Sequence, residues 1–386
     1  MTRPEPPPKS SKIPRNFPDG HAWELSQHQK NTKMAPTTEH ILPPTMRSWV
    51  RTRRGPASST LQLASIPTPD VPTEPSSDVL IRVSHASLQV STEMMMKAIP
   101  SLPFSGPWVP ELELSGHIVT AGGGAPAQLR TPGTRVIAFR NPLAAMLMGH
   151  GVLAEYVRLP SNQVCLIDPA VDMAAASGIH CSGSAALNMI RTAGVREGHR
   201  VLVNGASGSA GSLLVQLCKI RGAAVVGVAS GGNEAMVRGL GADEFIDYRQ
   251  HLPLSAYLAQ MYGDRPFDFI LDCVGTQELF VHSPDYLKPD GGVVNIGMLE
   301  GVGVTVWNML VNSWLPTRLG GVPRRYIGIS SPPKRDDAIY LAHLIEQGRL
   351  RIPVDSVFPM EDALGAYERI ATQRARGKVV IRVGSE

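Results

Sequence analysis

The sequence lacks the residues that several well-known nucleotide and hydrolase sites require. It contains no G-x-x-x-x-G-K-[ST] segment, which excludes a P-loop. It contains no G-x-S-x-G segment, so nothing supports a nucleophile elbow. The chain has only 4 cysteines, without close pairing, which fits a reduced compartment better than a disulfide framework. No apolar run approaches the roughly 18 residues of a membrane span, so we expect no membrane insertion.

The chain also lacks a large excess of charge of either sign. The formal net charge is +4, and the only dense basic cluster is Arg47, Arg51, Arg53 and Arg54. No aromatic platform accompanies this cluster, so we interpret it as a solvated strand and turn and expect no nucleic-acid partner. The hydrophobic share of 43% is sufficient for a sizeable core, and the length of 386 residues is sufficient for two domains.

Residues 1–45 have almost no apolar periodicity and are rich in Pro, Ser, Lys and His. Such a segment cannot bury enough apolar surface to offset the entropy lost on ordering, so we expect a disordered tail. A mitochondrial transit peptide is the alternative, but the acidic residues and repeated prolines of this tail argue against it. Met34 or Met46 would serve as alternative starts. We expect a cytoplasmic protein.

The most informative segment is Val201–Gly211, VLVNGASGSAG. The apolar run Arg200–Val203 before it predicts a buried strand, and Ser212–Arg221 after it carries apolar residues at helical spacing. Ala224–Ala229 predicts a second buried strand. A strand, a glycine turn, a helix and a strand form the context that a dinucleotide fingerprint requires.

The turn itself has three small positions, filled by Ala206, Gly208 and Gly211. Small residues let backbone N–H groups approach a pyrophosphate, and the N-terminus of the following helix then faces the negative charge. The alternative is a tight strand-to-helix turn that binds nothing, but the intact strand and helix on either side favour the nucleotide interpretation.

The end of the second strand indicates which cofactor binds. NAD sites usually place Asp or Glu there to hold the ribose hydroxyls. This chain has Ser230-Gly231-Gly232-Asn233 instead, and Glu234 is expected to open the next helix. The absence of a carboxylate removes the repulsion of a 2′-phosphate, to which Ser230 and Asn233 can donate hydrogen bonds. The sequence therefore favours NADPH over NADH, the alternative being that these residues only form a turn.

The remaining pattern divides the chain in two. Residues 46–170 are rich in short strands separated by Gly, Pro and Ser, whereas strands and helices alternate from about residue 171 to 330. The predicted strands of the first part are 47–53, 61–63, 79–86, 114–120, 135–138 and 153–159. Those of the second part are 200–203, 224–229, 244–246, 267–273, 292–296 and 326–330, with helices at 173–193, 212–221, 234–240 and 255–261. Gly241 is expected to be the C-cap of the helix at 234–240. A helix at 335–347, a strand at 354–358, a helix at 361–372 and a strand at 378–383 follow and are expected to return to the first part.

This organisation predicts an α/β protein with a doubly wound parallel-sheet domain at 171–330 inserted into a β-rich domain at 46–170 plus 331–386. Short-chain dehydrogenases place the glycine turn near the N-terminus and carry a Tyr-x-x-x-Lys pair. None of the 8 tyrosines here has Lys four residues on, so that class is excluded.

The order and spacing of several segments resemble the medium-chain dehydrogenase/reductase superfamily, in particular its zinc-independent quinone oxidoreductases and trans-acting enoyl reductases. The similarity covers roughly residues 46–386. The segments that carry it are DVLIRVSHASL at 78–88, TPGTRVIAF at 131–139, GVLAEYVRLP at 151–160, GAD at 241–243, DCVG at 272–275 and RGKVVI at 376–381. Thr134 stands where Asp is usual. The resemblance implies a GroES-like catalytic domain, an inserted Rossmann domain and a homodimer formed near 326–330.

The resemblance also implies cofactor contacts. Ser184 stands near the nicotinamide end, Tyr248 near the 2′-phosphate, and Lys378 would reach the phosphates from the last strand. Tyr248 is equally well explained as a packed surface tyrosine, while Val274 and Ile296 would act through their backbone. The full implied set is Ser184, Ser207, Gly208, Ser209, Ala210, Gly211, Ser230, Asn233, Tyr248, Val274, Gly275, Ile296, Gly297 and Lys378.

A catalytic zinc is not expected. Alcohol-oxidising relatives use a Cys, a Gly-His-Glu segment and a further Cys or His, but the matching stretch here is PELELSG at 110–116, with His117 after the glycine. Metal-free chemistry indicates reduction of a quinone or of a polarised C=C bond. Relatives place Asn and Tyr in the loop after the first catalytic strand. The loop expected here, residues 89–94, has Gln89 in place of the Asn and, near the missing Tyr, Met94.

We therefore predict an NADPH-dependent oxidoreductase that transfers hydride to a quinone or an α,β-unsaturated carbonyl of small-molecule size, with Gln89 and Thr92 as candidate catalytic residues. The alternative is a catalytically impaired nucleotide-binding protein with a structural or regulatory role. Segments 100–110 and 302–319 are expected to form loops over the substrate. Trp108, Trp307, Met309 and Trp314 suggest an apolar pocket, with ordinary packing or a dimer surface as the alternative.

Overall fold

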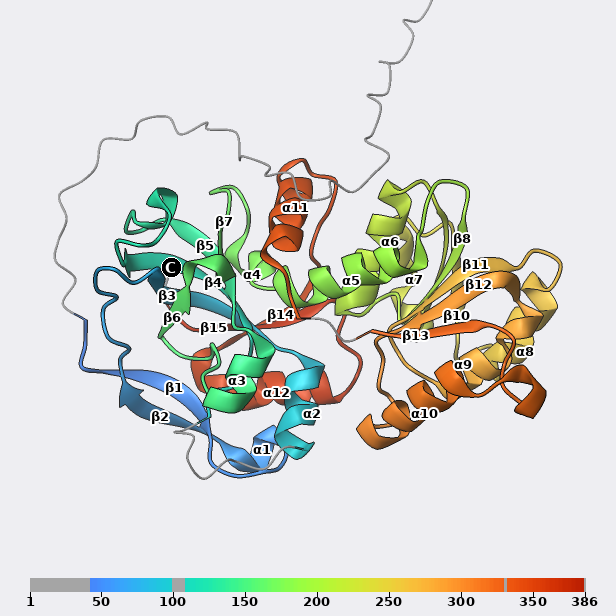
Figure 1. Cartoon of the computed structure of the whole chain (residues 1–386), viewed down its shortest axis with the longest axis horizontal. Coiled ribbons are helices and arrows are strands. Elements are labelled where there is room, and N and C mark those ends of the chain that lie inside the picture. The colour runs from blue at the N-terminus through green and yellow to red at the C-terminus, as the bar shows by residue number, and fades with distance from the viewer. Residues whose placement is uncertain (1–41, 99–107, 330–331, 385–386) are drawn as a thin grey trace, which may run out of the picture. The chain divides into compact units, whose positions relative to one another are not determined.

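The computed structural model describes residues 42–98, 108–329 and 332–384 (Figure 1). Residues 43–386 belong to one compact unit. The expected disordered tail lies outside the described residues except for its last four positions, and Thr45 already opens the first strand. Most of the loop expected at 100–110 also lies outside them.

The first sheet is mixed and has seven strands in the order β14-β15-β3-β4-β5-β7, with β6 paired to β3. Strand β15 pairs antiparallel with β3 and parallel with β14, so the end of the chain completes a sheet begun near its start. A separate antiparallel pair, β1 and β2, precedes it. The strands are β1 Thr45–Arg51, β2 Leu61–Pro67, β3 Asp78–Ser87, β4 Glu113–Ala121, β5 Arg135–Phe139, β6 Tyr156–Pro160, β7 Val164–Leu166, β14 Val354–Pro359 and β15 Lys378–Arg382.

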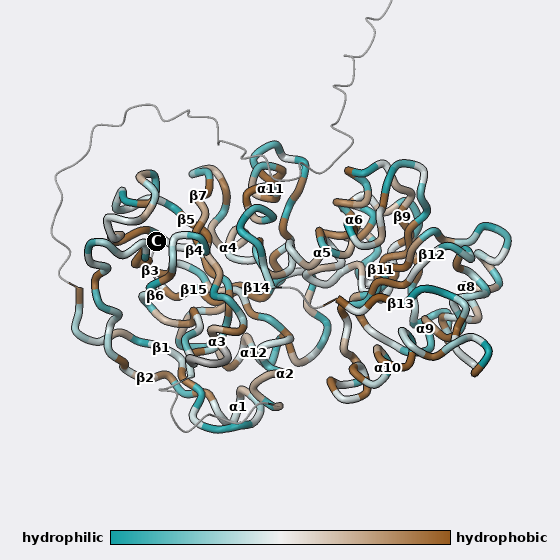
Figure 2. The backbone as a smooth tube through the Cα atoms, in the orientation of Figure 1, coloured by the Kyte–Doolittle hydropathy of each residue, from teal (hydrophilic) through white to brown (hydrophobic). Residues whose placement is uncertain are grey.

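The second sheet has six parallel strands in the order β10-β9-β8-β11-β12-β13. Its central strands are apolar along most of their length, as Figure 2 shows in brown, because both faces of a parallel sheet are covered by helices. The strands are β8 Arg200–Asn204, β9 Ala224–Ala229, β10 Glu244–Asp247, β11 Phe267–Asp272, β12 Leu287–Asn295 and β13 Arg325–Gly328.

Helices cover the two faces of this parallel sheet. Helices α5 and α6 contact each other and the strands of one face, whereas side chains of α8 and α9 join a buried cluster on the other (Figure 1). The helices are α1 Ala57–Thr60, α2 Val90–Ala98, α3 Pro142–Met148, α4 Met173–Ala176, α5 His180–Ala193, α6 Ser209–Ile220, α7 Glu234–Gly239, α8 Leu254–Tyr262, α9 Gln277–Val281, α10 Val302–Trp314, α11 Arg335–Glu346 and α12 Ala363–Ala371. Among the helices of the described residues, none has both the length and the apolar character needed to cross a bilayer.

The predicted fold class is confirmed, and four local predictions are wrong. The helix expected at 173–193 is two helices, α4 and α5, separated at residues 177–179. The segment after β3 forms helix α2 instead of a loop. The segment 302–319 contains helix α10. Helix α7 ends at Gly239, and Leu240 rather than Gly241 is its C-cap residue. The domain limits at 46–170 with 331–386, and at 171–330, stay a prediction.

The expected apolar pocket of tryptophans is also wrong. Trp307 and Trp314 on α10 are 67% and 80% exposed, so they line no pocket. Met309 on the same helix contacts Gly328 of β13. Trp108 lies under the guanidinium of Arg51, which is 4.7 Å from the ring centroid, and this arginine is buried instead of solvated.

Candidate active site

The predicted dinucleotide turn, residues 205–211, lies between β8 and α6, where the strand order of the parallel sheet reverses. Ligands of doubly wound sheets bind at such a switch point, outside the carboxyl ends of the strands. Gly205 has φ +79°, a conformation that favours glycine. A Cβ added at Gly211 would lie 2.1 Å from the carbonyl oxygen of Gly205. The small residues are therefore required for the close approach of helix and turn.

Helix α6 begins at Ser209, with Gly208 as its N-cap residue. The first N–H groups of a helix lack acceptors within the helix, and here they belong to Ser209, Ala210 and Gly211. The positive end of the helix dipole lies at these N–H groups and faces the switch point. This arrangement suits the binding of a negatively charged diphosphate.

Three of the predicted 2′-phosphate and pyrophosphate contacts lie together. The side-chain amide of Asn233 donates to Ser207 Oγ at 3.0 Å and to Ser230 Oγ at 3.1 Å. Tyr248 is 39% exposed, and its N–H donates to the carbonyl of Ala229, the residue before Ser230. Its hydroxyl accepts from Arg249 Nε at 3.4 Å.

Arg376 was not among the predicted residues, yet it lies beside this group. Its Nη2 is 3.5 Å from the position that a Cβ would take at Gly232, and its side chain is exposed. The adjoining Gly377 N–H donates to the carbonyl of Ser207 at 2.9 Å, which holds this segment against the turn. The sequence offered one sign of this position. Arg376 is the first residue of RGKVVI, a segment that carries the family resemblance and contains the predicted Lys378. The carboxylate of Asp247 lies near Gly231.

The predicted backbone contacts of the next two strands also lie at the switch-point edge. Asp272 Oδ1 accepts from the N–H groups of Val274 at 2.8 Å and Gly275 at 3.1 Å. Burial raises the pKa of Asp272. Gly297 N–H donates to Asn295 Oδ1 at 2.8 Å, and a Cβ at Gly275 would lie 2.3 Å from the carbonyl of Gly297.

Ile296 follows β12, and its N–H donates to the carbonyl of Asp272 at 3.0 Å. Asn204, at the end of β8, donates to Asp272 at 2.9 Å. Asn204 and Asp272 were not predicted as site residues, although together they fix the loop that carries the predicted backbone contacts.

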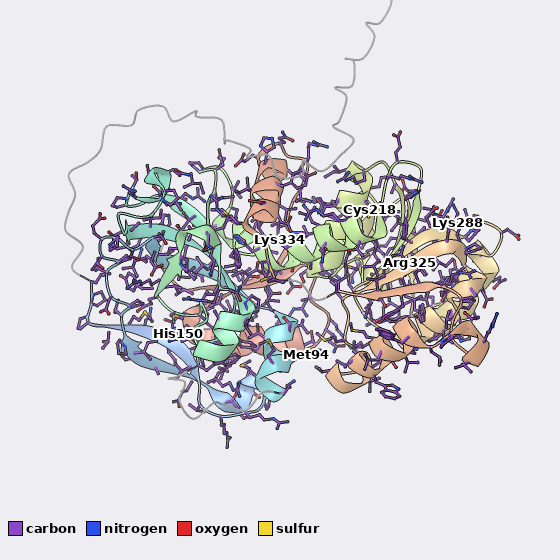
Figure 3. All side chains as sticks on the ribbon, in the orientation of Figure 1. Met94, His150, Cys218, Lys288, Arg325 and Lys334 are labelled. Carbon is purple, nitrogen blue, oxygen red and sulfur yellow. The ribbon has the colours of Figure 1, made fainter. Side chains whose placement is uncertain are left out.

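Ser184 lies on α5, the helix that packs against α6. It is 2% exposed, and its hydroxyl accepts from the N–H of Lys334, just before α11 (Figure 3), at 3.2 Å. Its role near the nicotinamide stays a prediction.

The candidate catalytic residues belong to a buried group that we call the carboxylate cluster: Gln89, Thr92, Glu111, Glu113, Tyr367 and Lys378. Gln89 precedes α2, the helix that also carries Met94 (Figure 3). Its side-chain amide donates to Glu113 Oε1, and its backbone N–H donates to Glu111 Oε2 at 3.0 Å. Thr92 Oγ1 donates to the same Oε2 at 3.3 Å. The structure therefore places both candidates on carboxylates that sequence reasoning did not single out.

Glu113 and Lys378 form an ion pair in the interior. Lys378 is 1% exposed, and its ammonium donates to Glu113 Oε1 at 2.5 Å. Glu113 Oε2 accepts from the N–H of Cys181 at 2.7 Å. A predicted contact between Lys378 and the cofactor phosphates would require this pair to open, and it stays a prediction.

Glu111 has no cation bound to it. Burial raises its pKa to about 8, although Tyr367, Gln89, Thr92 and Lys378 oppose that shift. At neutral pH this carboxyl is therefore largely protonated, whereas Glu113 is paired with an ammonium. Burial also raises the pKa of the Cys181 thiol well above its usual value, so this thiol remains protonated.

These residues do not fit a catalytic zinc. In the described parts of the chain, no group of three or more His, Cys, Asp or Glu side chains is placed to hold a metal ion. The carboxylate of Glu113 is already neutralised by Lys378. Four-coordinate zinc sites use Cys, His and carboxylate ligands that converge on one point.

Known families and proteins resemble this chain over most of its length. Residues 75–169 match the family described as "Alcohol dehydrogenase GroES-like domain", and residues 240–381 match the one described as "Zinc-binding dehydrogenase". The chain is 47% identical to the medium chain reductase pydE of Acremonium sp, over 88% of this chain and 99% of the relative. It is 33% identical to the trans-enoyl reductase poxH of Penicillium oxalicum, over 89% of this chain and 99% of the relative.

A solved structure shows the same fold. The quinone oxidoreductase of Coxiella burnetii superposes with a TM-score of 0.72, at 24% identity, over 88% of this chain and 100% of its own.

Proposed function

Because this chain belongs to the medium-chain dehydrogenase/reductase superfamily, whose oxidoreductases use a nicotinamide cofactor, we propose that it is an NADPH-dependent, zinc-independent reductase. Its substrate is a quinone or an α,β-unsaturated carbonyl. The names of its relatives, a medium chain reductase and a trans-enoyl reductase, support reduction over alcohol oxidation.

The observation that carries the proposal is the group of residues at the switch point. The glycine turn offers the first N–H groups of α6 to a diphosphate, and a Cβ at Gly211 would collide with the carbonyl oxygen of Gly205 and push helix and turn apart. Ser207, Ser230 and Asn233 offer polar groups next to it, and Arg376 adds a cation that suits a 2′-phosphate. Glu111, Glu113 and Lys378 lie in a different part of the site.

The reaction needs a hydride and a stabilised enolate or quinol oxygen. Reduced NADPH supplies the hydride when it is bound. Gln89 has two side-chain N–H groups, of which one donates to Glu113 and one is left to donate to the substrate's carbonyl oxygen. A donor fixed before the reaction stabilises negative charge that develops on that oxygen. The paired Glu113 and Lys378 add no net charge beside it.

The proposed residue roles follow from these positions. Ser207, Gly208, Ser209, Ala210 and Gly211 bind the diphosphate, and Ser230, Asn233 and Tyr248 lie toward the 2′-phosphate. Val274, Gly275, Ile296 and Gly297 border the ribose and carboxamide through their backbone.

We also propose that two copies pair through β13, the edge strand of the parallel sheet. Apolar side chains of the neighbouring α10 are exposed, including Val306, Leu310 and Trp314. A molar mass of one chain in multi-angle light scattering at micromolar concentration would contradict this pairing.

The test of the function uses the full chain. Calorimetric titration with NADPH and NADH measures binding, and the loss of absorbance at 340 nm is followed with quinones and enoyl thioesters. We expect tighter binding of NADPH and turnover with at least one acceptor. Binding without turnover would favour the catalytically impaired nucleotide-binding protein, and no heat with either cofactor would overturn both interpretations.

A further inference from the structure

Glu111 is a buried residue that the proposed chemistry leaves without a role. It is 1% exposed and adopts φ +68°, in the left-handed region that non-glycine residues rarely occupy. Its side chain meets three donors: Tyr367 OH at 2.6 Å, Gln89 N–H at 3.0 Å and Thr92 Oγ1 at 3.3 Å. A strained backbone and a buried carboxyl are both unfavourable, so their combination at one residue points to a function.

What Glu111 holds is the backbone of Gln89. Glu111 accepts from the main-chain N–H of Gln89, while Glu113 accepts from its side-chain amide. Tyr367, which is 2% exposed on α12, in turn holds the second oxygen of Glu111. Gln89 is thus fixed at both ends by two carboxyl groups that lie two residues apart at the start of β4.

We propose that Glu111, supported by Tyr367, is a positioning residue of the reduction site. It fixes the main chain of Gln89. With the main chain fixed, one N–H of the side-chain amide stays bound to Glu113, and the other N–H keeps a constant direction toward the substrate's carbonyl oxygen. This inference rests on the proposed function for its kinetic consequences. The hydrogen bond to Gln89 itself is testable without turnover.

Both carboxyl oxygens of Glu111 are used in this role, because Tyr367 OH donates to Oε1 and the Gln89 N–H donates to Oε2. Ionisation would place a second negative charge beside Glu113, with Lys378 the cation that acts on both.

Other titratable groups surround Glu111 and its partner. They are Tyr367 on α12, Lys378 on β15, Glu113 on β4 and Cys181 on α5, and Glu93 on α2 acts on Tyr367. Burial raises the pKa values of both Tyr367 and Cys181 well above the usual range, so neither titrates near pH 8. Burial raises the pKa of Glu111 itself to about 8, and activity is expected to fall as the pH rises through that value.

Three variants test the proposal. Glu111→Gly removes the carboxyl and suits the positive φ, so it should fold. Glu111→Gln keeps an oxygen for the Gln89 N–H but cannot ionise. Tyr367→Phe removes one support of Glu111. Tyr262→Phe is the matched control, because Tyr262 OH donates to Glu244 at 2.8 Å in another part of the chain.

Steady-state kinetics use NADPH with 1,4-benzoquinone and with a crotonyl thioester. We expect kcat to fall about tenfold in Glu111→Gly, with less loss in Tyr367→Phe and substantial rescue in Glu111→Gln, since small displacements of a positioned group lower rates strongly. The dissociation constant of NADPH should be unchanged, and Tyr262→Phe should match the native chain. The native kcat should decline above pH 8, and that decline should be absent in Glu111→Gln.

Amide hydrogen exchange gives a readout that needs no acceptor. The Gln89 N–H should exchange slowly in the native chain and in Glu111→Gln, faster in Tyr367→Phe and fastest in Glu111→Gly. Equal exchange and equal kcat in all the variants would overturn the positioning role. If the native chain binds NADPH but reduces no acceptor, the proposed reduction fails, while the exchange rates still decide whether Glu111 holds Gln89.

Discussion

The glycine turn after β8 and the carboxylate cluster at the start of β4 contribute to one proposed site by different means. The turn uses backbone N–H groups and requires only that side chains be small, as the 2.1 Å approach of a Cβ at Gly211 to Gly205 shows. The cluster uses side chains that meet from β4, α2, α12 and β15, and each of them has a specific partner. Sites built from the backbone are thus set by local spacing, whereas sites built from side chains depend on the whole fold.

The largest effect on cofactor binding is expected at the turn. In Gly211→Ala the added methyl group meets the carbonyl of Gly205, so helix α6 must shift and its N–H groups lose their positions. We expect NADPH affinity to fall at least about 100-fold, which corresponds to roughly 2.7 kcal/mol. Calorimetry measures the loss. Gly303→Ala is the control, because a Cβ there meets nothing within 4 Å. Equal affinity in both variants would show that the turn does not bind the diphosphate.

The largest effect on the free energy of unfolding concerns the ion pair of the cluster. Lys378→Met leaves Glu113 buried without its cation, and breaking such a pair typically costs about 3–5 kcal/mol. Urea unfolding measures the free energy of unfolding. The double variant Glu113→Gln with Lys378→Met should recover most of the loss, because no unpaired charge is left. A double variant no more stable than Lys378→Met would contradict this account.

The third prediction concerns the dependence of stability on pH that Glu111 produces. Folding raises the pKa of Glu111 to about 8, whereas an unfolded Glu titrates near about 4.3. The folded state therefore binds the extra proton, so this contribution is complete at low pH and is lost as the pH rises to 8. Between pH 5 and pH 9 we expect a loss on the order of a few kcal/mol that Glu111→Gln does not show. Identical slopes for both proteins in urea unfolding would refute the protonated Glu111.

The smallest effect is expected at Arg376. Replacement of this exposed cation by Met should weaken NADPH binding by about tenfold and leave NADH binding unchanged, since only NADPH carries the 2′-phosphate. Arg374→Met, two residues away and also exposed, is the control. An equal change for both cofactors would place Arg376 away from the 2′-phosphate.

The same contrast explains what could be predicted from the sequence. The glycine turn and both sheets were predicted because small residues and apolar runs recur at fixed spacing, whereas the loops after β11 and β12 were singled out by the family resemblance alone. Glu111 was missed because its partner Tyr367 lies 256 residues further along the chain. Lys378 was predicted at the phosphates, but its ammonium pairs with Glu113, 265 residues before it.

The segment 302–319 shows a different limit. Its apolar residues were interpreted as the lining of a substrate loop, yet most of them lie on the exposed surface of α10. The apolar composition of a segment indicates that its side chains will be removed from water, but it does not identify the partner that covers them.

The pairing of β15 with β3 has a consequence for synthesis on the ribosome. The residues of β3 are made before all the strands of the parallel sheet, whereas their antiparallel neighbour β15 is made after them. The mixed sheet cannot close until Lys378–Arg382 has been translated, when the parallel sheet already has all its strands. A premature stop codon only a few positions before Lys378 would therefore leave β3 with an unpaired edge in the nascent polypeptide, and such truncated products should depend on chaperones or be degraded.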